Sequence, residues 1–259
     1  MAQELDEIIA KGYELEVEDR FDSGRLDESL WFPYYLPQWS SREQAAARYE
    51  LREGSLHLLI ERDQPPWCPA LDGPTRVSSL QTGVFAGPRG SKIGQHRFKA
   101  EAVVQEEQPP LRLYTPRYGV FALRAAALDD PACMVALWMI GYEDRPERSG
   151  EICICEIFGR DVGPNRAAVG VGVHPFADPD LRDDFERVSL PIDARASHEY
   201  AAEWTPEQVA FFVDGRRIKT VEQSPTYPMQ FMLNVYEFGE PTSPASTYPK
   251  RFVVEGFRA

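Results

Sequence analysis

The chain is divided into many short strand-like segments, and this pattern constrains its fold more than any other feature. Runs rich in β-branched and aromatic residues recur from residue 13 to residue 258, separated by many of the 22 prolines and 18 glycines. Such runs, bounded by turn residues, are typical of β-strands. Only residues 3–12 have the pattern of a short amphipathic helix. The sequence therefore predicts an all-β fold of two packed sheets, a sandwich or jelly roll.

The predicted strands and turns leave no evident boundary between domains. Asp214-Gly215 predicts a hairpin because a type I′ turn needs positive φ at both central residues. Because no shift in composition divides the chain, residues 1–259 are expected to form one domain, with 1–13 as an N-terminal extension. Proline-rich loops are expected over 63–75, 106–117 and 240–250. Strands are expected over 13–21, 49–61, 78–85, 97–105, 118–128, 133–141, 150–159, 167–174, 198–204, 208–222, 229–238 and 251–258.

Charge and composition narrow the classes of partner. A formal net charge of −13 at pH 7 disfavours nucleic acids and other polyanions, so a neutral ligand is expected. No run approaches the ~20 apolar residues of a membrane span, so no membrane partner is expected. The first ten residues lack the basic and apolar segments of a signal peptide. A cytoplasmic protein is therefore expected, or a secreted one if the natural chain has been trimmed.

The segment Gly150–Gly159 places two carboxylates in a strand that is otherwise apolar. Glu151 and Glu156 flank Cys153 in this run. Burying an unpaired carboxylate costs about several kcal/mol of folding free energy. Two carboxylates in a buried strand therefore indicate a functional role or a compensating partner. Residues five apart fall on opposite faces of a regular strand. One β-bulge would return both glutamates to the face of Cys153.

Two facing carboxylates are the groups that retaining cleavage of a glycosidic bond requires. One attacks the anomeric carbon and the other protonates the leaving oxygen, at a separation of about 5–5.5 Å. The charge of the first raises the pKa of the second and keeps it protonated. Taken alone, however, the spacing of Glu151 and Glu156 fits two glutamates on the solvent face of an ordinary strand at least as well.

The surrounding segments favour the catalytic interpretation. Glu151-Ile152-Cys153-Ile154-Cys155-Glu156 resembles the Glu-x-Asp-x-x-Glu motif of glycoside hydrolase family 16, in the bulged form found in laminarinases, which are endo-β-1,3-glucanases. Four further segments are similar to segments of that family, in the same order, and extend the resemblance from about residue 14 to the C-terminus. They are Phe21-Asp22-Ser23, Tyr118–Arg124, Ala136–Gly141 and His198–Pro206, the last followed by Phe211–Gly215.

This resemblance implies a fold, an activity and a site. The fold is a concanavalin-like jelly roll of two curved antiparallel sheets, with a substrate cleft on the concave face. The activity is retaining endo-hydrolysis of a neutral β-glucan, most simply at the β-1,3 linkages of a laminarin-like polysaccharide. Glu151 matches the nucleophile and Glu156 the acid/base, with Cys153 between them. The positions that match cleft-lining residues are Arg124, Trp138, His174, Asn234 and Tyr236.

The chain departs from the family pattern in ways that keep other activities open. Cys153 replaces the central aspartate, and a thiol is a weaker hydrogen-bond donor, so activity is expected to fall. Met134 and Ala122 stand where the family has tryptophan and glutamate, and each removes a possible sugar contact. A non-catalytic or weakly active glycan-binding protein and a transglycosylase are therefore the alternatives.

Metals and cofactors have little support in the sequence. Four histidines without ligand-like spacing predict no transition-metal site, and no cofactor is expected. A structural calcium ion is common in the family. Glu18, Asp19 and Asp22 are its candidate ligands, although an exposed acidic turn explains them equally well.

Overall fold

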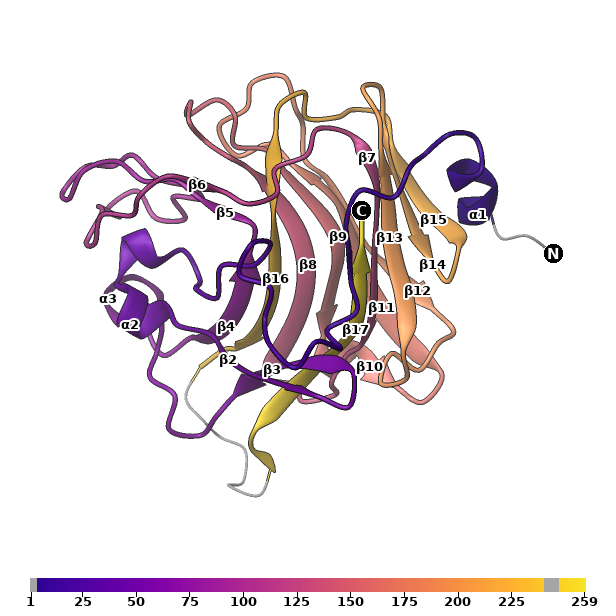
Figure 1. Ribbon diagram of the computed structural model, residues 1–259, viewed down its shortest axis with the longest axis horizontal. Helices are drawn as coiled ribbons and strands as arrows, with labels where there is room; N and C mark the ends of the chain where they lie inside the picture. The colour runs from indigo at the N-terminus through magenta and orange to yellow at the C-terminus, as the bar shows by residue number, and fades with distance from the viewer. Residues whose placement is uncertain (1–3, 240–246) are drawn as a thin grey trace.

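Two antiparallel sheets form the body of the molecule in the computed structural model, which describes residues 4–239 and 247–259 (Figure 1). The larger sheet has eight strands in the order β15 (Arg216–Val221), β14 (Val209–Val213), β13 (His198–Trp204), β7 (Gly119–Ala126), β17 (Lys250–Arg258), β3 (Ser55–Ile60) and β2 (Arg48–Arg52), with β1 (Glu18–Asp19) paired to β17. The smaller has seven, in the order β10 (Val162–Gly163), β11 (Arg166–His174), β9 (Glu151–Phe158), β8 (Cys133–Gly141), β16 (Met229–Glu237) and β4 (Arg76–Gln81), with β12 (Asp184–Leu190) paired to β11.

The main hydrophobic core lies between these sheets. Alternate residues of the central strands point into it, as a period of two requires. Trp204 and Phe231, from opposite sheets, are both wholly buried and each contacts Phe121 edge-on or tilted. The core runs from Phe21 to Phe257 in sequence. The sequence-based prediction of an all-β sandwich is confirmed.

The outer face of the seven-stranded sheet has a second layer built from connecting segments. These segments contain η1 (Pro37–Trp39), α2 (Arg42–Ala45), α3 (Pro69–Asp72) and the small sheet of β5 (Gly83–Val84) and β6 (Leu111–Arg112), which Figure 1 shows beside β4, β16 and β8. Buried side chains from these segments pack on outward-facing residues of β8 and β16 in a second cluster. This layer leaves part of the sheet face uncovered.

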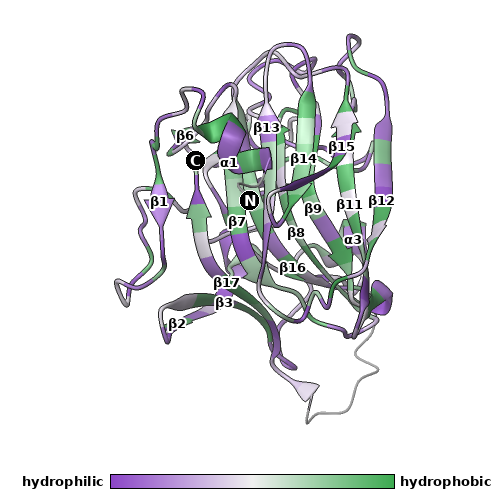
Figure 2. Ribbon diagram, turned by 90° about the vertical axis from the view of Figure 1, so that its right-hand side faces the viewer, coloured by the Kyte–Doolittle hydropathy of each residue, from purple (hydrophilic) through white to green (hydrophobic). Residues whose placement is uncertain are grey.

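The N-terminal helix covers the opposite side of the molecule. Helix α1 (Glu4–Ile9) buries Leu5 and Ile8 against Ala122 and Phe212 on the outer face of the eight-stranded sheet. Figure 2 shows the helix in front of β7, β13 and β14. The amphipathic helix expected over 3–12 is thus present but ends at Ile9, and residue 3 lies outside the described residues.

The structure confirms one expected turn and corrects several expected elements. Asp214 and Gly215 have φ of 48° and 72°, so the hairpin turn is confirmed. The expected strand over 97–105 is wrong: its backbone bonds to loops, and it buries Ala102 and Val104 in the second cluster. Strand β12 was not predicted, because the charged residues of this edge strand obscure its alternation of apolar and polar positions. Most of the predicted loop 240–250 lies outside the described residues.

Candidate active site

A β-bulge in β9 brings both candidate carboxylates to one face of the sheet. Between Cys153 and Glu156, β9 has one more residue than either neighbouring strand. Ile154 and Cys155 therefore both join the core, whereas Cys153 packs in the outer cluster. Glu151, Cys153 and Glu156 line the same cleft. The bulge predicted from the five-residue spacing is confirmed.

That cleft lies on the outer face of the seven-stranded sheet and has a volume of about 260 Å³. Its floor comes from β8, β9 and β16, and its walls come from the connecting segments. Aromatic rings predominate, as expected for a surface that packs against the apolar faces of sugar rings. The lining residues are Tyr35, Trp67, Asp72, Thr75, His96, Phe98, Met134, Ala136, Trp138, Glu151, Cys153, Cys155, Glu156, Tyr236 and Phe238.

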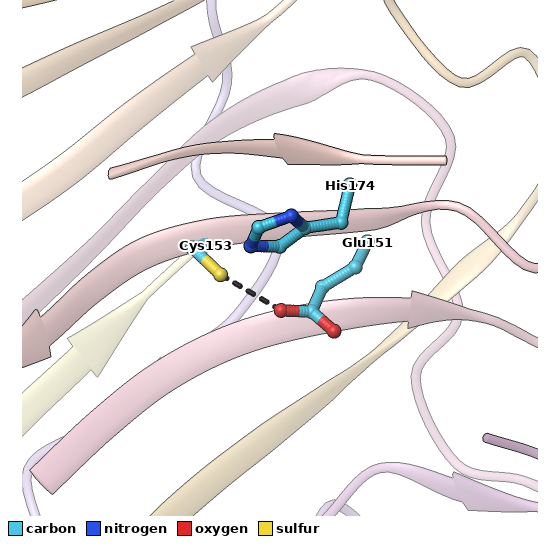
Figure 3. Close-up of side chains that lie close together, drawn as sticks. All are labelled: Glu151, Cys153 and His174. Carbon is cyan, nitrogen blue, oxygen red and sulfur yellow. Dashed lines mark hydrogen bonds between the residues drawn. The ribbon is translucent and has the colours of Figure 1, made fainter. Parts of the chain in front are cut away.

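Glu151 is buried and contacts two of the other predicted residues. The Cys153 thiol donates a hydrogen bond to Glu151 Oε1 at 2.8 Å. His174, which pairs with Glu151 across β9 and β11, places its ring beside both side chains (Figure 3). Burial raises the pKa of Glu151 to about 7, while the Cys153 hydrogen bond and His174 act in the opposite direction. The carboxyl therefore changes charge near neutral pH.

Glu156 occupies a more open and more polar part of the cleft. Burial raises the pKa of its carboxyl, and His174, Arg187 and Arg160 oppose the rise. On the neighbouring strand, Gly170 makes room for both Phe185 and Glu156, because a Cβ there would lie 2.6 Å from the Phe185 ring and 3.2 Å from the Glu156 Cβ. The two carboxyls thus share a cleft, and the charge of Glu156 contributes to the raised pKa of Glu151.

The predicted residues of β8 and β16 form a connected group. Trp138 lines the cleft and donates from Nε1 to Asn234 Oδ1 at 2.5 Å. Asn234 is wholly buried and does not line the cleft, so its predicted direct contact with a glycan is wrong. Tyr236 lines the cleft and donates to the Tyr35 hydroxyl at 3.3 Å.

Arg124 belongs to the other side of the molecule, and its predicted place in the cleft is wrong. It lies on β7 of the eight-stranded sheet, is exposed, and pairs with Glu255 at 2.9 Å. Its neighbours Leu123 and Ala125 face the core, which directs Arg124 outward. Ala122 likewise packs under α1, so its difference from the family pattern removes no sugar contact.

Some cleft residues come from loops that the sequence analysis passed over. The rings of Trp67 and Phe98 are tilted against each other with centroids 5.3 Å apart, and His96 contacts Trp138 edge-on. Burial lowers the pKa of His96 to about 4, so its ring is neutral at neutral pH. The His96 backbone N–H donates to Glu143 Oε1, which anchors this loop. The available signal was the aromatic side chain of Trp67 in the proline-rich connection 63–75.

The structure also bears on the metal predictions. Glu18 pairs with Arg20, and Asp19 accepts from Trp31 Nε1, so these candidate calcium ligands already have protein partners. Although the histidines have no ligand-like spacing in the sequence, β-sheet pairing brings donor atoms of Glu151, Cys153 and His174 within 4.8 Å of one another. Among the described residues, the helices are all too short or too polar to cross a membrane.

Sequence comparison identifies the family. The family described as Glycosyl hydrolases family 16 matches residues 114–249, just over half of the chain. The protein therefore belongs to this glycoside hydrolase family, whose chemistry needs no cofactor and whose substrates are glycans. Comparison with curated proteins gave no match.

Solved structures agree on the jelly-roll fold. A GlcNAcα1-4Gal-releasing endo-β-galactosidase from Clostridium perfringens is 28% identical with a TM-score of 0.81; the match covers 95% of this chain and 62% of that one. Laminarinases from Rhodothermus marinus and Flavobacterium sp. UMI-01 are 21% and 18% identical, with TM-scores of 0.64 and 0.65. These matches cover 95% of this chain and 96% and 99% of the laminarinases. At that identity they show the fold alone.

Proposed function

We propose that the protein is a retaining endo-glycoside hydrolase that cleaves an internal β-linkage of a neutral glycan. The observation that carries this proposal is the bulge in β9, which turns Glu151 and Glu156 into one cleft. Two carboxyls on one face are the groups that this chemistry needs. An open, aromatic-lined cleft suits a polymer that extends beyond the bond to be cut.

Each carboxyl has a separate task in the proposed mechanism. Ionised Glu151 attacks the anomeric carbon, and Glu156 gives its proton to the leaving oxygen as the glycosidic bond breaks. The sugar is then held covalently on Glu151. Glu156, now ionised, removes a proton from water, which attacks the same carbon and releases Glu151. Burial raises the pKa of the Glu156 carboxyl, which is the direction that a proton donor requires.

Cys153 supplies the hydrogen bond that holds the proposed nucleophile. Its thiol donates to Glu151 Oε1 and so favours the ionised carboxylate. Burial, followed by the nearby carboxyls, raises the pKa of the thiol itself, so Cys153 stays protonated and available as a donor. A thiol donates more weakly than a carboxylic acid, which supports lowered rather than abolished activity.

We infer that the glycan contains β-linked galactose. Support comes from the endo-β-galactosidase, which is 28% identical over 95% of this chain. The competing substrate is the laminarin-like β-1,3-glucan expected from the sequence. The laminarinases named above resemble the chain less, at 18–21% identity. The net charge of −13 favours a neutral polymer in either case.

Reducing-sugar release from a panel of glycans tests these proposals. The panel comprises galactose-containing oligosaccharides with internal β-linkages, agarose, laminarin and lichenan, and Glu151→Gln is the control. Release from a galactoside by the wild type but not by Glu151→Gln is expected. Release from laminarin alone would transfer the proposal to β-1,3-glucan.

Two outcomes of the same panel would favour the alternative functions. Binding of an oligosaccharide without release from any glycan, at enzyme levels where Cys153→Asp is active, would indicate a binding protein. Longer products in the presence of acceptor sugars would indicate transglycosylation.

A further inference from the structure

Three side chains with different donor atoms converge at the bulged strand. A carboxylate oxygen of Glu151, the sulfur of Cys153 and a ring nitrogen of His174 all lie within 4.8 Å of one another. Figure 3 shows a nitrogen of the His174 ring facing the sulfur. Ligand atoms bound to one ion at about 2.0–2.3 Å lie roughly 3–4 Å apart in a tetrahedral site. Small side-chain adjustments therefore bring all three within reach of one ion.

The surroundings of His174 resemble those of a metal ligand. Its Nδ1 pairs with Asp183 Oδ1 at 2.5 Å, and its ring stacks on Phe185 with centroids 4.9 Å apart. These contacts fix the ring and leave Nε2 facing Glu151 and Cys153. A carboxylate on the second ring nitrogen is typical of zinc-bound histidines, because it orients the ring and raises its basicity.

The kinds of donor atom select the metal. A thiolate, an imidazole and a carboxylate suit Zn²⁺, whereas Ca²⁺ and Mg²⁺ prefer oxygen alone. Glu151 and Cys153 line the open cleft, so a fourth ligand position can take water. Cys153, which stands where the family motif has aspartate, is the residue that makes the set selective for zinc.

We propose that Glu151, Cys153 and His174 form a Zn²⁺ site in the cleft and that bound zinc switches hydrolysis off. Zinc binding engages the Glu151 carboxylate and so removes the group that attacks the anomeric carbon. Cys153 loses its proton to solvent as the zinc–sulfur bond forms. The binding site stands on geometry alone, whereas the inhibition rests on the proposed function of Glu151.

Calorimetry with Zn²⁺ on the metal-stripped protein tests the site independently of activity. One ion per chain is expected, and Co²⁺ in its place should give a thiolate-to-cobalt charge-transfer band. Cys153→Ser should weaken zinc binding at least tenfold and abolish the band. Asp183→Asn should weaken binding by about 10–100-fold. Cys68→Ser is the matched control, since its hydroxyl can keep the hydrogen bond to the Trp39 carbonyl.

Circular dichroism shows whether each variant is folded. The site is overturned if the folded wild type binds no zinc, or if Cys153→Ser binds it as tightly as the wild type does. Inhibition is measured separately on a glycan that the metal-free enzyme cleaves, where Cys153→Ser should resist zinc. Zinc binding without inhibition would overturn the switch and leave the site. Zinc binding by a protein that cleaves no glycan would overturn the switch together with the proposed hydrolysis, again leaving the site.

Discussion

Replacing Cys153 changes the hydrogen bond that its thiol donates to Glu151, and the pH dependence of hydrolysis should report the change. Burial places the pKa of Glu151 at about 7, and the thiol opposes the rise. Because Glu151 must be ionised to attack, kcat/KM should fall below about pH 7. Cys153→Ala removes the donor and should raise the apparent pKa of this acid limb. Cys153→Ser supplies a stronger donor and should lower it.

The size of the shift follows from the hydrogen bond. A bond to a charged group contributes about 1.5–3 kcal/mol with ordinary donors and less with a thiol, and one pKa unit corresponds to about 1.36 kcal/mol. Cys153→Ala should therefore move the acid limb up by roughly 0.5–1 unit. At pH 6 this shift lowers kcat/KM by about three- to tenfold, whereas kcat/KM at the optimum pH stays close to that of the wild type.

The assay is kcat/KM between pH 4.5 and 9 on the preferred glycan, in buffer with a chelator that removes zinc. The two limbs of the pH profile report the coupled pair of Glu151 and Glu156. The quantity compared between each variant and the wild type is therefore the apparent pKa of the acid limb. Shifts in opposite directions for alanine and serine support the reasoning. An acid limb that stays in place, or moves the same way in both variants, would refute it.

Three further predictions concern stability. The pair Arg76–Glu237 is almost wholly buried at 2.5 Å, so Arg76→Met should cost about 3–5 kcal/mol in urea unfolding because it strands a buried charge; a loss under 1 kcal/mol would contradict this. Burial raises the pKa of Glu143 to about 8, so the folded state holds this proton more tightly. Stability should therefore fall as pH rises from about 5 to 8, and Glu143→Gln should flatten that fall in thermal unfolding. Leu5→Ala should release α1 and speed limited proteolysis of the first twelve residues, with a cost of about 2–3 kcal/mol if the helix unfolds with the sheets.

Local sequence was enough to predict the sheets and the key strand. A period of two, interrupted by turn residues, predicted most strands because each has one face in the core. The five-residue spacing of Glu151 and Glu156 predicted the bulge, since only an extra residue puts both on one face. These features depend on neighbours along the chain, which the sequence states directly.

Features that depend on contacts between segments distant in sequence could not be predicted from local sequence patterns. Arg124 has the same alternation whichever sheet its strand joins, so its place on the far side could not be foreseen. The meeting of His174 with Glu151 and Cys153 depends on the register of β11 against β9. Cleft walls such as Trp67 come from loops without periodicity.

Azide rescue of the two alanine variants tests the proposed roles of the carboxyls most directly. Each variant is given an aryl β-glycoside of the preferred sugar, whose leaving group needs little protonation. In Glu151→Ala, azide should attack in place of the carboxylate and give the α-glycosyl azide. In Glu156→Ala, azide should attack the glycosyl-enzyme and give the β-glycosyl azide. The same anomer from both variants, or the two anomers exchanged, would contradict the assignment of Glu151 as nucleophile and Glu156 as acid/base.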